Sequence, residues 1–66
     1  MVRYYTVAMD MADGSDVPEE TFKYHIMALA RYSRINLSAQ GVVYKSLSVT
    51  TDNGDEILAR ESFGEA

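Results

Sequence analysis

The side chains of this 66-residue chain that could do chemistry are one histidine and two clusters of acidic residues. Histidine is the side chain that most often serves as a general acid or base, and His25 is the only one in the sequence. No Gly-x-Ser-x-Gly, Ser-x-x-Lys or His-Glu-x-x-His pattern accompanies it. The chain has no Cys, which excludes thiolate nucleophiles and disulfides. We therefore interpret His25 as a structural residue beside the core and expect no catalytic residue and no enzyme activity.

The two acidic segments, Asp10–Asp16 and Asp52–Glu56, contain the oxygen ligands that hard metal ions prefer. If Gly14 took the turn position of a calcium loop, Met9 and Met11 would occupy ligand positions, and a thioether does not serve a hard cation. The second segment has the composition of a tight turn. We therefore predict solvated turns, with no metal and no cofactor.

The dipeptide Asn53-Gly54 is the strongest structural signal, because both residues tolerate the positive φ of a tight turn. A two-residue loop would place Leu47 opposite Arg60, which is a poor pair. A three-residue loop at 52–54, with Gly54 as a bulge residue, shifts the register by one. Its pairs are Val49–Ile57, Leu47–Ala59, Lys45–Glu61 and Val43–Phe63. We predict this bulged hairpin, and we expect Lys45, on its apolar face, to lie at a sheet edge or beside a bulge.

Residues 2–11 alternate apolar and polar side chains as a half-buried strand does. The core face of this strand would carry Tyr5, Val7, Met9 and Met11. The start of a helix is predicted by Asp16 and Glu19, which form a capping-box pattern around Pro18. Helical spacing then gives a core stripe. Its members are Phe22, Ile26, Leu29 and Ser33.

These elements predict a single α+β domain over residues 1–66, of order β-α-β-β. Its strands run over about 2–11, 42–51 and 55–63, with a turn at 52–54, and its helix runs over about 18–33. One helix packs on one face of a three-stranded sheet that ends in a C-terminal β-hairpin. A right-handed crossover between parallel strands at 2–11 and 42–51 would place the strand at 55–63 between them.

The far face of the predicted helix is less polar than a solvent-facing surface should be. It carries Tyr24 and Met27, next to Ala28, with Glu20 and Arg31 beside them. Tyr, Met and Arg are enriched in protein–protein interfaces. We interpret Tyr24, Met27, Arg31 and Glu20 as a candidate partner-binding face.

The outer face of the predicted sheet is a second candidate surface. It gathers Tyr4, Tyr44, Leu58 and Arg60, and this set is more apolar than solvent requires. We interpret it as a partner or homodimer surface. Aromatic side chains on a sheet can also stack on bases, but six cations against ten acids, a net charge of −4, argue against nucleic acid.

No run of the sequence approaches the roughly 20 apolar residues of a membrane-spanning helix, and no signal peptide is recognisable. With the absence of Cys, this favours a cytoplasmic location and no membrane contact.

A small acidic chain of this architecture, with surplus exposed Tyr and Met, resembles the small inhibitors that phages make against host enzymes or defence complexes. That group includes the anti-CRISPR proteins and inhibitors of host polymerase or glycosylase. The resemblance is one of size and architecture, and it implies a non-enzymatic protein-interaction module that binds another protein and blocks it. The alternatives are a homodimeric accessory or assembly subunit and a weak nucleic-acid-binding protein with an aromatic sheet face. The loop Asp10–Asp16 offers one more mode of binding, as a charge mimic of nucleic acid.

Overall fold

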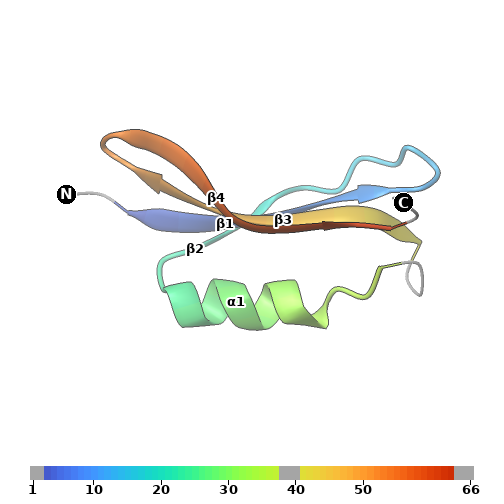
Figure 1. The fold of residues 1–66 in the computed structure, drawn as a ribbon, viewed down its shortest axis with the longest axis horizontal. Helices are drawn as coiled ribbons and strands as arrows, with labels where there is room; N and C mark the ends of the chain where they lie inside the picture. The colour runs from blue at the N-terminus through green and yellow to red at the C-terminus, as the bar shows by residue number, and fades with distance from the viewer. Residues whose placement is uncertain (1–2, 38–40, 64–66) are drawn as a thin grey trace.

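The fold is that of a computed structural model in which residues 3–37 and 41–63 are described. Over these residues, four strands form one antiparallel sheet of order β2-β1-β3-β4, and one helix covers one face of it (Figure 1). The elements are β1 (Tyr4–Met11), β2 (Glu20–Phe22), α1 (His25–Arg34), β3 (Val42–Thr51) and β4 (Gly54–Ser62). The predicted α+β class, with a helix on one sheet face and a C-terminal hairpin, is confirmed.

The predicted strand order is wrong, because the sheet has a fourth strand. Residues Glu20–Phe22 form β2, which pairs antiparallel with β1, with Tyr5 opposite Phe22. This return strand reverses the chain once more before α1. Consequently β3 enters the sheet antiparallel to β1 and next to it, and β4 lies at the edge instead of between them.

The predicted start of the helix is also wrong. It begins at His25, with Tyr24 as an N-cap that makes no side-chain capping bond. The backbone around Thr21 is engaged in the ladder with β1, so the capping-box pattern of Asp16 and Glu19 is not used. The end of the helix at Arg34 lies one residue beyond the predicted end.

The hairpin has the predicted register in the half that is remote from the turn. Leu47 faces Ala59 and Lys45 faces Glu61. The backbone N–H of Phe63 donates to the carbonyl of Val43 at 2.8 Å.

Near the turn the predicted three-residue loop at 52–54 is wrong, because Thr51 pairs with Gly54 and the loop has two residues, 52–53, so the register differs by one residue. Val49 faces Glu56 instead of Ile57, because the extra residue of the bulge is Leu58 and not Gly54. The Thr51 hydroxyl closes the turn by accepting from the Asn53 N–H and donating to the Gly54 carbonyl. Gly54 has a φ of +114°, which L side chains rarely adopt, so the turn does require its glycine.

The core lies between the sheet and α1. Its buried apolar residues are Val7 from β1, Val42 and Leu47 from β3, Ala28 and Tyr32 from α1, and Ile35 just after α1. The predicted core face of β1 is confirmed, since Tyr5, Met9 and Met11 pack against this cluster.

The predicted core stripe of the helix is wrong for Ile26, Leu29 and the exposed Ser33, whereas Phe22 does pack against the core, but from β2. Ile26 is 77% exposed and Leu29 is 43% exposed, whereas Ala28 is fully buried. Ala28 and Tyr32 are four residues apart and form the buried face of the helix, and Ile35, the C-cap residue, packs in the same core. The prediction placed Ala28 on the far face of the helix, next to Tyr24 and Met27, and this placement is wrong because Ala28 packs in the core. The small Ala28 instead allows the helix to approach the sheet closely, and Tyr32 fills the core.

With α1 in this orientation, substitution by Asp should have a small effect on stability at position 26 and a large effect at position 28. Ile26→Asp should change the free energy of unfolding by no more than about 0.5 kcal/mol, because the side chain is exposed. Ala28→Asp should lower it by about 3 kcal/mol or more, or prevent folding, because it buries an unpaired charge. Urea denaturation of both variants measures the difference. A stable Ala28→Asp beside an unfolded Ile26→Asp would mean that the other stripe faces the sheet.

Candidate functional site

A concave groove lies between β2 and α1, here called the β2–α1 groove. It has a volume of about 440 Å³. It is lined by Glu20 and Phe22 from β2 and by Ile26, Met27, Ala30, Arg31 and Arg34 from α1. The two-residue connection at 23–24 brings the edge strand and the helix side by side, so their side chains face a common space.

Two of the predicted partner-binding residues bind each other across this groove. The Arg31 Nε donates to the Glu20 Oε2 at 2.6 Å, and both side chains remain partly exposed. This ion pair connects α1 to β2. Arg34, also in the groove, makes no ion pair with any residue that the structure describes.

Large apolar side chains continue from the groove over the helix. Tyr24, Ile26, Met27 and Leu29 are all exposed, and we call them the α1 apolar surface. The exposure of Tyr24 and Met27 agrees with the sequence prediction. Ile26 and Leu29 were missed because they had been assigned to the core. The signal that could have identified them is the spacing of Ala28, Tyr32 and Ile35.

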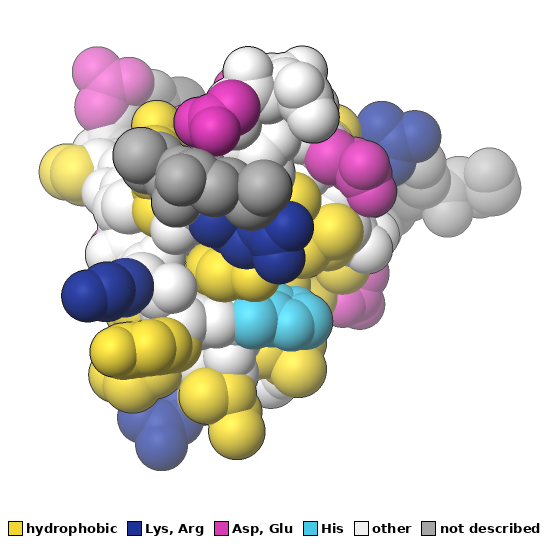
Figure 2. All heavy atoms as spheres, turned by 90° about the vertical axis from the view of Figure 1, so that its left-hand side faces the viewer, with side chains coloured by type: hydrophobic (Ala, Val, Ile, Leu, Met, Phe, Trp, Pro, Cys, Tyr) yellow, Lys and Arg dark blue, Asp and Glu magenta, His cyan; other side chains and the backbone are white. Residues whose placement is uncertain are grey.

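The segment that contains this surface is basic, although the chain is acidic. Residues 23–34 include three of the six cations, Lys23, Arg31 and Arg34, and none of the ten acids. In a view from the end where α1 begins, apolar side chains lie beside Lys and Arg side chains at the level of the helix, and most of the visible Asp and Glu side chains lie above (Figure 2). The surface is therefore apolar and positively charged.

A buried lysine holds α1 in this orientation. The Lys45 Nζ donates to the carbonyls of Tyr32, at 3.0 Å, and Ile35, at 2.9 Å. These carbonyls lie at the C-terminal end of α1, where a cation is favoured, and the Tyr32 carbonyl also accepts from the Ile35 N–H at 3.2 Å. Lys45 lies on the inner strand β3, and not at a sheet edge as one of our alternatives had it.

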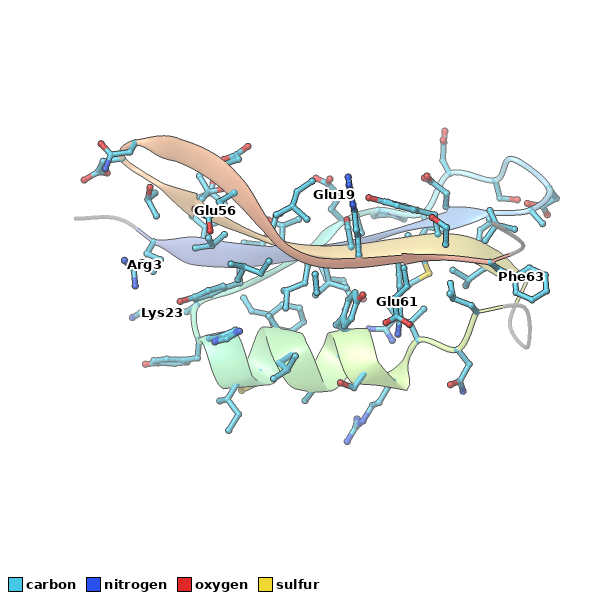
Figure 3. All side chains as sticks on the ribbon, viewed as in Figure 1. Arg3, Glu19, Lys23, Glu56, Glu61 and Phe63 are labelled. Carbon is cyan, nitrogen blue, oxygen red and sulfur yellow. The ribbon has the colours of Figure 1, made fainter. Side chains whose placement is uncertain are left out.

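Glu61 and Tyr32 complete this cluster. Glu61 points from β4 toward α1 (Figure 3), with its Oε2 3.5 Å from the Lys45 Nζ. The Tyr32 hydroxyl donates to the same Oε2 at 3.1 Å, and the Lys45 Nζ lies 4.3 Å from the centre of the Tyr32 ring. Burial, and then the hydrogen bond to Glu61, raise the pKa of Tyr32 to about 12.

His25 is exposed and stacks on Tyr5 of β1, with ring centres 5.1 Å apart and planes 17° from parallel. In the part of the chain that the structure describes, no three His, Cys, Asp or Glu side chains gather as metal ligands would.

In the acidic loop, hydrogen bonds from Ser15, through its side chain and then its backbone, lower the pKa of Asp13. The bond from the Ser15 N–H to the Asp13 Oδ1 measures 2.9 Å. No helix in the described ranges is both long enough and apolar enough to cross a membrane.

The structure does not bring the predicted sheet-face residues into one patch. Tyr4 faces Thr50, at the opposite end of β3 from Tyr44. Leu58 lies at the bulge of β4, and Arg60 faces Ser46. Only Tyr44 and Arg60 come together, around a polar hollow of about 350 Å³ that Glu61 and Ser62 complete.

Comparison of the chain with protein-family models, with curated proteins and with solved structures found no match.

The position of Tyr32 predicts a loss of stability at high pH. Folding raises the pKa of this phenol from about 10 to about 12. The protonated phenol therefore contributes fully to the free energy of unfolding below pH 10, and this contribution is lost as the pH rises toward 12. Urea unfolding between pH 8 and 12 should show this decrease in the free energy of unfolding. The Tyr32→Phe variant should lack the part of the decrease that comes from ionisation of Tyr32. An equal decrease in Tyr32→Phe and the parent would contradict the proposed environment of Tyr32.

Proposed function

We propose that this protein is a small non-enzymatic interaction module that binds another protein through the α1 apolar surface and the adjoining β2–α1 groove. The observation that carries the proposal is the exposure of Tyr24, Ile26, Met27 and Leu29 on a ten-residue helix and its N-cap. Single exposed apolar residues are common, but several large ones together mark an interaction site.

The size of these side chains gives the surface enough energy for a specific contact. Complete burial of one large apolar side chain contributes about 1.5–3 kcal/mol. Binding energy in interfaces is concentrated in a few such residues, among which Tyr and Arg are enriched. Tyr24 and Ile26 would serve as anchors, while the ion pair of Arg31 and Glu20 would lie at the rim.

The biological role that fits a module of this kind is inhibition. A chain without catalytic residues acts on a partner by occupying the surface that the partner needs. We therefore propose that it blocks an enzyme or a defence complex, as the small phage inhibitors that it resembles in size and architecture do.

A homodimeric accessory or assembly subunit is the second candidate, because a second copy could also cover the α1 apolar surface. The positive charge of residues 23–34 favours a different protein as the partner over a second copy of this chain. Contact between two copies of α1 would bring the cations Lys23 and Arg34 of both copies close together, with no acid in residues 23–34 to neutralise them, whereas Arg31 is already paired with Glu20.

The proposal predicts that Ile26→Lys/Met27→Lys folds but loses its partner. Partners captured from a lysate by the parent chain are first identified by mass spectrometry. Binding of the purified partner is then measured by calorimetry, and the double variant should lose about 2 kcal/mol or more, roughly 30-fold in affinity. The control, Asn53→Lys/Ser62→Lys, adds the same charge at exposed positions outside α1 and should bind as the parent does.

Undiminished binding by the folded double variant would contradict the proposal. Sedimentation distinguishes the second candidate. A mass of twice 7.4 kDa that the double variant reduces to the monomer would favour the homodimer instead.

A further inference from the structure

The free edge of β2 lies beside the β2–α1 groove. We infer that this groove binds an extended peptide segment that pairs with β2, places apolar side chains in the groove and presents a carboxylate to Arg34. This inference rests on the proposed function, and it specifies which part of a protein partner is recognised.

The backbone of β2 is the first argument. In the order β2-β1-β3-β4, β2 pairs with β1 on one side, and no described strand lies on its other side. An unpaired edge offers N–H and C=O groups to an added strand, which is a common mode of peptide recognition. The other edge strand, β4, is a poorer template because it carries a bulge at Leu58 and three acids, Asp55, Glu56 and Glu61.

The shape of the groove is the second argument. Glu20 and Phe22, two residues apart on β2, both line it, so this face of the edge strand looks toward α1. A strand added to β2 would direct every second side chain into the same space. The apolar lining of Phe22, Ile26 and Met27, with the small Ala30 between the larger residues, bounds an open groove of about 440 Å³. This space accommodates more than one apolar side chain.

Charge is the third argument, and it decides the chemistry of the peptide. Arg31 is already paired with Glu20, but Arg34 lies in the groove without an ion pair among the described residues. Lys23 lies near the other end of α1, 5.9 Å from the Tyr24 ring centre, and residues 23–34 contain no acid. An Arg guanidinium at the end of an apolar groove is complementary to a carboxylate, with which it can form two parallel hydrogen bonds.

The test uses three fluorescein-labelled peptides and the full chain. The first is Thr-Leu-Thr-Leu-Thr-Asp-amide with fluorescein on its N-terminal amine, and its two Leu and one Asp lie on one face when the peptide is extended. The second replaces Asp with Lys, and the third carries N-methyl groups on the backbone nitrogens that face β2. Fluorescence anisotropy should show at least fivefold weaker binding for the Lys peptide and at least tenfold weaker binding for the N-methylated one.

Two substitutions make the charge prediction specific. Arg34→Glu should reverse the preference, so that the Lys peptide binds more tightly than the Asp peptide. Arg60→Glu, which makes the same change on β4, should leave the preference unchanged. Equal binding of all three peptides, an unchanged preference in Arg34→Glu, or binding to anionic phosphatidylserine vesicles without binding to any peptide would overturn the inference.

The result can be separated from the test of the proposed function. If Ile26→Lys/Met27→Lys loses its protein partner but no peptide binds, the proposed function stands and the extended-peptide inference is wrong. If the double variant keeps its partner, the proposed function itself is wrong.

Discussion

The position of α1 depends on one buried charge, the ammonium of Lys45. Burial of an unpaired ammonium costs several kcal/mol, so this group requires acceptors within reach. It obtains them from the carbonyls of Tyr32 and Ile35, at the end of α1, and from Glu61 on β4. The requirement fixes which side of the helix faces the sheet, because Tyr32 and Ile35 must lie over β3. Ala28, one turn earlier, then faces the sheet as well.

The exposed surface follows from that constraint. Because Ala28 and Tyr32 face the sheet, Ile26 and Met27 have to point away from it. These two large side chains therefore remain exposed to solvent. The short strand β2 sets their surroundings, because it brings Glu20 and Phe22 beside the helix and leaves a free edge there. The α1 apolar surface, the β2–α1 groove and the free edge of β2 therefore lie next to one another, and the proposed binding of another protein rests on this combination.

The parts of this fold that could be predicted from sequence are those that local chemistry determines. The turn at Gly54 follows from a dipeptide that tolerates positive φ, and the core face of β1 follows from alternation. β2 could not be predicted, because three residues show too little periodicity to outweigh a capping-box pattern. The face of α1 could not be chosen either, because its two apolar stripes have the same period and the deciding contact comes from Lys45, 13 residues from Tyr32 and 10 from Ile35. Tyr24 and Met27 were identified as exposed, but the groove that they adjoin depends on β2.

The most direct test of this account is the effect of Lys45→Met on the stability and the amide hydrogen exchange of α1. Met keeps a similar apolar length but leaves the carbonyls of Tyr32 and Ile35 without this donor. The account predicts a loss of about 2–3 kcal/mol in the free energy of unfolding and faster exchange along α1. Glu61→Gln, at a side chain that is more than half exposed, should cost less than about 1 kcal/mol. A Lys45→Met variant that is as stable as the parent, with α1 equally protected, would contradict the central role of Lys45.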